Sequence, residues 1–125
     1  AAGVHVGQSD IPAAIARKLI GPDKILGVST ATVEESIEAE KNGADYIGTG
    51  AVFPTSTKLD ARAVTVEMLK SIKKNIKIPV VAIGGISENN VQSLRDADID
   101  GVAVISAILG KQNIKEASES LLKLI

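Results

Sequence analysis

The densest group of chemically useful side chains lies in residues 45–58, DYIGTGAVFPTSTK. This stretch begins as a short apolar segment, passes two glycines and ends in three hydroxyl groups and one ammonium group. Those four side chains belong to Thr55, Ser56, Thr57 and Lys58. Glycine lets a backbone approach a ligand closely, and hydroxyl and ammonium groups donate hydrogen bonds, so the loop could bind phosphate oxygens. A polar surface turn after a strand has a similar composition, and both interpretations stay open at this point.

Two further side chains with possible chemistry are His5 and Asp10. A loop carboxylate such as Asp10 is a hard oxygen ligand, and Mg²⁺ often binds one or two carboxylates together with substrate phosphates. Aspartate just before a helix is also a favoured N-cap, and taken alone the position favours the cap. For His5, a hydrogen-bonded place in the core is a better expectation than a role as base or metal ligand.

The pair Gly84-Gly85 and the side chain of Ser106 could contribute to anion binding. Backbone N–H groups of a glycine turn that leads into a helix can point at an anion, and here Ser87 is the expected helix cap. Ser106 is expected to open a short helical turn over residues 107–110, and β/α barrels often bind phosphate at their last two loops. Ordinary turns also use glycine pairs, so this signal is weak by itself.

The elements that must position these residues alternate regularly along the chain. Short apolar, β-branched segments predict strands at residues 3–7, 25–29, 45–49, 80–83 and 101–105. Amphipathic segments predict helices at residues 11–20, 32–42, 65–75, 87–96 and 114–125. This order is typical of an α/β fold with right-handed crossovers. Most of the strands are continuously apolar, which is typical of parallel strands that are covered on both faces.

Because parallel strands end at the same edge of a sheet, the candidate residues are expected to converge there. A weak internal repeat supports equivalent units: GADYIG, from Gly43, and IDGVAVI, from Ile99, both place a small or acidic residue before a strand. Such repetition is typical of a β/α barrel. Five strand-helix units are too few to close an eight-unit barrel, so we expect either a small open sheet or part of a larger barrel.

Composition argues against two classes of partner. The net charge is −1, and basic and acidic residues are interspersed, so no basic stripe indicates nucleic acid. Aromatic residues make up 2%, too few for a platform on which single-stranded bases stack. No apolar run reaches membrane-spanning length, and residues 1–10 lack the pattern of a signal peptide. We therefore expect no nucleic acid and no membrane partner. A cytoplasmic location is expected, with which the absence of cysteine is compatible.

Taken together, five segments resemble the thiamine phosphate synthase family over essentially the whole chain. They are GVHVGQSD, ILGVS, GADYIGTGAVFPTSTK, PVVAIGGIS and DGVAVISAI, in this order and spacing. The resemblance implies a (β/α)8 TIM barrel, of which residues 1–125 would be the C-terminal portion, a partial barrel of about five βα units. It also implies a transferase that joins a hydroxymethylpyrimidine diphosphate to a hydroxyethylthiazole phosphate. Thiamine phosphate and diphosphate would be the products, and Mg²⁺ would assist departure of the diphosphate.

The resemblance further implies roles for individual residues. Asp10 would be a Mg²⁺ ligand, Ser29 would contact the pyrimidine diphosphate, and Lys58 would contact the diphosphate, which makes Ser29 and Lys58 the expected catalytic residues. Thr55, Ser56 and Thr57 would bind the phosphate of the thiazole substrate. The remaining contacts to that phosphate, largely through backbone amides, would come from Gly85, Ile105 and Ser106.

Members of this family have three further βα units before the segment GVHVG, and these carry a second Mg²⁺ carboxylate and a cationic cluster. The resemblance therefore implies that the 125-residue chain alone is inactive, and that it self-associates or pairs with an N-terminal half. Two alternatives remain. One is a thiazole tautomerase-like paralogue, against which Thr55, Thr57 and Lys58 argue, because that family uses a histidine in this loop. The other is a non-catalytic half-barrel fragment that is active only when complemented.

Overall fold

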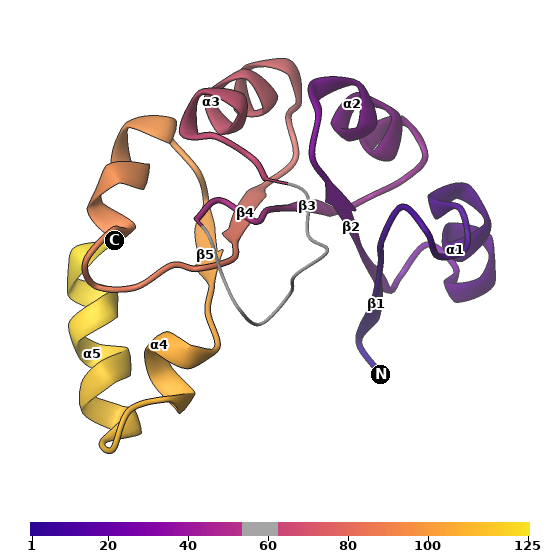
Figure 1. Ribbon diagram of the computed structural model, residues 1–125. Coiled ribbons are helices and arrows are strands. Elements are labelled where there is room, and N and C mark those ends of the chain that lie inside the picture. Colours follow the sequence, from indigo (N-terminus) through magenta and orange to yellow (C-terminus); the bar gives the residue numbers. More distant parts are fainter. Residues whose placement is uncertain (54–62) are drawn as a thin grey trace.

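The computed structural model describes residues 1–53 and 63–125, which contain a five-stranded parallel sheet (Figure 1). Its strands are β1 (Gly3–Val6), β2 (Ile25–Thr30), β3 (Tyr46–Thr49), β4 (Val80–Ile83) and β5 (Gly101–Ala103). The strands lie side by side in chain order, and each neighbouring pair is parallel. A doubly wound sheet would reverse its strand order at a switch point, whereas a barrel keeps chain order. The predicted partial β/α barrel is therefore confirmed.

Helices connect the strands and lie in an arc along one side of the sheet, from α1 past α2 and α3 to α5 (Figure 1). The helices are α1 (Ala13–Ile20), α2 (Val33–Lys41), α3 (Val66–Asn75), the 3₁₀ helix η1 (Val91–Ala97), α4 (Ser106–Leu109) and α5 (Ile114–Leu124). The side chains of Thr32 and Thr65 cap α2 and α3, since each accepts a hydrogen bond from the N–H group three residues later. None of the helices in the described ranges has the length and apolar character that crossing a membrane requires.

The predicted helix over residues 87–96 is wrong in its start and type, because η1 begins at Val91 and is a 3₁₀ helix. The side chain of Asn90 explains the late start. Its Oδ1 accepts a hydrogen bond from the Ser87 N–H at 2.9 Å, and its Nδ2 donates to the Gly85 carbonyl at 2.8 Å. These two bonds hold the segment before Val91 in a turn, so Ser87 is not the cap of a helix. The predicted strand over residues 101–105 is also shorter and ends at Ala103.

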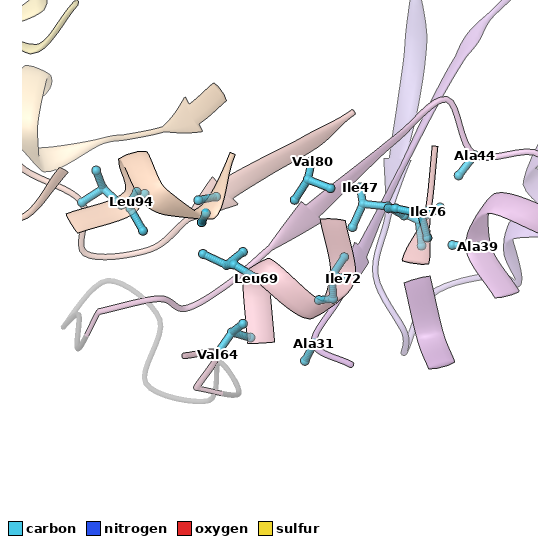
Figure 2. Close-up of a cluster of buried hydrophobic side chains, with 14 of the residues drawn as sticks. Ala31, Ala39, Ala44, Ile47, Val64, Leu69, Ile72, Ile76, Val80 and Leu94 are labelled. Carbon is cyan, nitrogen blue, oxygen red and sulfur yellow. The ribbon is translucent and has the colours of Figure 1, made fainter. Parts of the chain in front are cut away.

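The apolar core lies between the sheet and the helices. Figure 2 shows Leu69 and Ile72 of α3 near Ile47 of β3 and Val80 of β4, and all four side chains are fully buried. Because successive residues of a strand point to opposite faces, the strand residues next to these buried ones face away from the helices. In β4, for example, Val80 is buried while Val81 is only half-buried. The prediction that both faces of the sheet are covered holds for β2 and β3, which carry buried residues at consecutive positions, but not for β1 and β4 of the described residues. Their helices cover one face, and the other, concave face stays partly open.

The amino end of the sheet is held by an aspartate before β3. Asp45 accepts a hydrogen bond from the Leu26 N–H of β2 at 2.8 Å and pairs with the Arg17 guanidinium of α1 at 2.5 Å. Arg17 also donates to the carbonyl oxygens of Gly21, Lys24 and Gly43. The Leu26 N–H and Arg17 hold the pKa of the Asp45 carboxyl below its usual value. One guanidinium therefore ties the end of α1 to the loops that lead into β2 and β3.

The same arrangement recurs two units later, before β5. Asp100 accepts a hydrogen bond from the Val80 N–H of β4 at 2.8 Å and pairs with Lys73 of α3 at 2.5 Å. Burial pushes the pKa of Asp100 upward, but the hydrogen bonds from Lys73 and the Val80 N–H outweigh it and leave the pKa below its usual value. The sequence repeat around Gly43 and Ile99 thus corresponds to a repeated contact that joins a strand to its neighbour, β3 to β2 and β5 to β4.

Candidate functional site

The predicted site residues in the described ranges lie at the carboxyl end of the sheet. Ser29 is near the end of β2, Asp10 follows β1, Gly85 follows β4, and Ile105 and Ser106 follow β5. Because all five strands are parallel, these positions share one edge. The predicted convergence is therefore observed for this part of the site.

The predicted phosphate loop, Thr55, Ser56, Thr57 and Lys58, lies outside the described residues. Its flanking residues are placed. The Phe53 N–H donates to the Gly84 carbonyl at 3.1 Å, and the Val64 N–H donates to the Ala51 carbonyl at 2.8 Å. Both flanks are thus attached at the carboxyl ends of β3 and β4, next to the glycine turn.

Asp10 does not cap α1, although the sequence alone favoured that interpretation. The residue before α1 is Pro12, and no side chain caps this helix. The Asp10 carboxylate turns back instead: its Oδ2 accepts a hydrogen bond from the Gly7 N–H at 2.7 Å, while the Asp10 N–H donates to the Gly7 carbonyl at 3.1 Å. This pair of bonds fixes an exposed carboxylate in the loop directly after β1.

A carboxylate in this position has the donor chemistry that Mg²⁺ prefers. Within residues 1–53 and 63–125, no three His, Cys, Asp or Glu side chains form a cluster that could hold a metal ion. Asp10 therefore fits a cation that takes one carboxylate here and its other oxygen ligands from bound phosphates or from elsewhere in the protein.

The glycine turn after β4 has a backbone that only glycine adopts readily. Gly84 and Gly85 have φ angles of 98° and 68°, in the left-handed region. A Cβ at Gly85 would also lie 2.6 Å from the Phe53 carbonyl oxygen. The turn therefore depends on glycine for its conformation and for the close approach of residue 53.

The last predicted contacts lie where β5 leads into α4. Ile105 is 61% exposed, and Ser106 is the first residue of α4 and is also exposed. The first N–H groups bonded within this turn are those of Ile108 and Leu109, which both donate to the Ile105 carbonyl. The N–H groups of Ser106 and Ala107 precede them, at the start of the turn, where a helix offers no intrahelical partner.

His5 and Tyr46 lie beside Ser29 on the concave face, although the sequence assigned no chemistry to either. His5 Nδ1 lies 2.8 Å from the Tyr46 hydroxyl, and His5 Nε2 lies 2.7 Å from Ser29 Oγ. His5 is exposed, so its predicted place in the core is wrong, although the prediction of a hydrogen-bonded histidine is confirmed. His5, Gly27 and Tyr46 occupy matching positions on adjacent strands, and this register is not visible in the sequence of any single strand.

The parallel sheet runs in chain order and carries glycine, hydroxyl and carboxylate groups at its carboxyl edge. This arrangement is that of a β/α-barrel protein, whose site is expected at that edge. The family model described as thiamine monophosphate synthase matches residues 1–108. The chain belongs to this family, which is a transferase family acting on small-molecule substrates.

Individual relatives agree with the family match. The chain is 65% identical over 119 residues to a thiamine-phosphate synthase of Alkaliphilus oremlandii, covering 95% of this chain and 57% of that protein. It is 58% identical over 121 residues to one of Clostridium tetani, covering 97% and 58% of the two chains. The solved thiamine phosphate pyrophosphorylase from Pyrococcus furiosus superposes with a TM-score of 0.89 at 46% identity, covering 99% of this chain and 59% of that one. A 3-hexulose-6-phosphate synthase with a TM-score of 0.72 and 17% identity shares the fold alone.

Proposed function

We propose that this chain contributes the carboxyl-edge half of a thiamine phosphate synthase site. The reaction joins a hydroxymethylpyrimidine diphosphate to a hydroxyethylthiazole phosphate and releases diphosphate. The observation that supports this most is the family match over residues 1–108, which includes all the candidate site residues. The relatives carry the synthase name, so the tautomerase-like alternative is not favoured.

In this proposal the two substrates bind at different parts of the edge. Ser29 contacts the pyrimidine, since its hydroxyl lies on the open concave face beside His5. The thiazole phosphate binds at the glycine turn and at the start of α4, through Gly85, Ile105 and Ser106, together with Thr55, Ser56 and Thr57. The positive φ angles at the turn support this assignment, because such turns can aim backbone N–H groups at an anion.

The diphosphate is the group whose negative charge grows as it leaves. Lys58 is proposed to stabilise that charge, and Asp10 to hold Mg²⁺ beside it. When bound, the cation would neutralise phosphate oxygens, and electrostatic stabilisation of this kind is often the largest catalytic contribution. The attacking atom is a neutral ring nitrogen, so the reaction needs no strong general base. His5, the single histidine of the sequence, is accordingly engaged with two hydroxyl groups.

A complete site is proposed to need more βα units than this chain supplies. The chain spans less than three fifths of the length of the relatives described above. In the described sheet, β1 and β5 each pair with one neighbour, and apolar side chains at Val4 and Ile25 are more than 40% exposed. Open parallel edges and exposed apolar surface favour association. We propose that residues 1–125 form the C-terminal portion of a cytoplasmic barrel. On their own they would be inactive, and would self-associate or pair with an N-terminal half.

A complementation experiment tests this proposal. Residues 1–125 are purified, sized by light scattering, and assayed for thiamine phosphate alone and after mixing with the first three βα units of a relative such as that of Clostridium tetani. We expect activity only in the mixture. An active monomer of residues 1–125 would contradict the partial-barrel proposal, and a mixture that associates without activity would contradict the assigned reaction.

Calorimetry separates the two substrate positions. The chain alone should bind the thiazole phosphate more tightly than the pyrimidine diphosphate, because the groups assigned to the former all lie within residues 1–125. Tighter binding of the pyrimidine diphosphate in the presence of Mg²⁺ would overturn the assignment of Gly85, Ile105 and Ser106.

A further inference from the structure

Three side chains from three adjacent strands form a continuous hydrogen-bonded row on the concave face. Tyr46 on β3 contacts His5 on β1, and His5 contacts Ser29 on β2, at 2.8 and 2.7 Å respectively. The tyrosine and histidine rings are tilted by 40° with their centroids 5.6 Å apart. We refer to Tyr46, His5 and Ser29 as the polar row.

The sheet makes room for the polar row at Gly27. This residue pairs in register with His5 on one side and Tyr46 on the other. A Cβ at Gly27 would lie 2.2 Å from a ring carbon of Tyr46 and 2.5 Å from Nδ1 of His5. The two rings therefore meet across β2 only because residue 27 has no side chain.

Ser29 is held at two points, by β1 and by the loop that follows it. The Gln8 side chain donates to the Ser29 carbonyl at 2.8 Å, while His5 contacts the hydroxyl. Neighbouring concave positions on β4 are instead apolar, namely Val81 and Ile83. A row of polar groups that faces the open side and fixes one hydroxyl is a means of presenting that hydroxyl to a ligand, because exposed hydrogen bonds add little to stability.

The chemistry of the row determines which way its hydrogens point. A neutral imidazole has one donor nitrogen and one acceptor nitrogen, whereas the two hydroxyl groups can play either part. A phenol is a stronger acid than an aliphatic alcohol, so the Tyr46 O–H is the better donor and His5 Nδ1 the acceptor. In that tautomer Nε2–H donates to Ser29 Oγ, and the hydrogen of Ser29 points out of the row. The opposite tautomer would consume that hydrogen inside the row.

We propose that Tyr46 and His5 are positioning residues that commit the Ser29 hydroxyl to donate a hydrogen bond to an acceptor atom of the substrate. This inference rests on the proposed function, under which the acceptor is a ring nitrogen of the aminopyrimidine. Tyr46 sets the tautomer of His5, and His5 sets the direction of the Ser29 hydrogen. The row acts on the pyrimidine substrate and leaves the thiazole phosphate unaffected.

Kinetics of the full-length protein that carries this sequence test the positioning role. The variants are Tyr46→Phe, His5→Phe and His5→Gln, whose amide can still donate toward Ser29. Loss of one hydrogen bond of this kind corresponds to about a three- to ten-fold effect. We expect such a rise in KM for the pyrimidine diphosphate in Tyr46→Phe and His5→Phe, partial recovery in His5→Gln, and less than about a two-fold change in KM for the thiazole phosphate.

Ser36→Ala provides the matched control. Ser36 is fully buried and its hydroxyl lies 2.7 Å from Thr30 Oγ1, so this variant also removes a hydroxyl contact to β2, but on the helix side of the sheet. Both KM values should stay unchanged in Ser36→Ala although the protein is less stable. If the KM values for both substrates rise together in Tyr46→Phe, the contacts are merely structural and the proposal is overturned.

Imidazole ¹⁵N NMR measures the tautomer independently of activity, with the His5 signals assigned by their loss in His5→Gln. We expect Nε2–H in the wild type and a shift toward Nδ1–H in Tyr46→Phe. An Nδ1–H wild type, or a tautomer that Tyr46→Phe leaves unchanged, would overturn the proposal. If the wild-type protein makes no thiamine phosphate, the proposed function fails, while the NMR result still decides how the row is polarised.

Discussion

The two ends of the sheet use polar side chains in opposite ways. At the amino end, Asp45 and Asp100 each accept a backbone N–H and pair with a cation from an earlier helix. At the carboxyl end and on the concave face, His5 and Ser29 are hydrogen bonded but remain accessible. The charges at the amino end are paired with other groups of the same chain, whereas the polar groups at the carboxyl end can still bind a ligand. This matches the division in β/α barrels between a stabilising face and a catalytic face.

The contacts at the amino end repeat along the sheet, whereas the segments at the carboxyl end vary. The aspartate contacts before β3 and β5 are nearly the same, even though one cation is Arg17 and the other Lys73. The carboxyl-end segments differ from unit to unit: a carboxylate follows β1, two glycines follow β4, and a serine follows β5. Equivalent units thus share similar contacts at the amino end, while each places a different candidate group at the carboxyl end.

The largest expected effect comes from Lys58 at the site. Lys58→Ala should raise the activation free energy of the full-length protein by about 3 kcal/mol, because an ammonium on a departing diphosphate acts where charge develops. The free energy of unfolding and the affinity for thiazole phosphate should change little. Steady-state kinetics measure the activation free energy, and calorimetry measures the affinity for thiazole phosphate. The control is Lys115→Ala, which changes an exposed lysine. Equal losses in rate and binding would instead indicate a ground-state contact.

Arg17 should show the reverse pattern. Arg17→Lys removes a planar group that donates to three carbonyl oxygens and to Asp45, and a lysine cannot reproduce this geometry. We expect the free energy of unfolding to fall by about 2 kcal/mol, with unchanged kcat/KM for the folded fraction. Denaturant unfolding provides the measurement. The control is Arg95→Lys, since Arg95 donates to the single carbonyl of Leu124. A fall in kcat/KM larger than the unfolded fraction would contradict the division between the two ends.

Gly27→Ala should lower both the stability of the protein and its affinity for the pyrimidine substrate. The added methyl group would overlap the rings of Tyr46 and His5, so we expect a loss of about 1 kcal/mol in stability. Affinity for the pyrimidine diphosphate should fall in the same variant. Gly101→Ala is a matched control, because a Cβ there would meet no atom within 4 Å. Calorimetry that finds the same pyrimidine affinity in both variants would show that the polar row does not support binding.

The smallest effect is the acid dependence of the amino-end contacts. The pKa values of Asp45 and Asp100 are lowered in the folded protein, so the unfolded chain binds protons first as the pH falls. Their contribution is therefore complete above about pH 4 and is lost as the pH falls through the folded pKa values. Both carboxylates are more than 40% exposed, so each should contribute under about 1 kcal/mol. Unfolding measured from pH 6 to pH 2 should show a shallower acid loss in Asp100→Asn than in wild type. Equal slopes would contradict this account.

Much of the fold could be predicted from local patterns. The order of strands and helices followed from β-branched runs and helical spacing. The placement of Ser29, Gly85 and Ser106 at one edge also followed, because alternating strands and helices imply parallel strands. Predictions failed where a side chain competed locally with the backbone. The Asn90 side chain accepts a hydrogen bond from the Ser87 N–H and holds a turn where a helix start was predicted. The Asp10 carboxylate accepts a hydrogen bond from the Gly7 N–H instead of capping α1.

Sequence alone therefore determined the order of the elements, the edge at which the candidate residues gather and the types of residue available there. Only the tertiary structure decided that Tyr46, separated from His5 by 41 positions, completes a row with Ser29, and that Arg17 and Asp45, 28 positions apart, form an ion pair. Periodicity, capping and glycine turns act over a few residues and can be recognised in the chain. Contacts between distant residues depend on strand register and on which face each side chain takes, and a shift of one residue would separate every one of these partners.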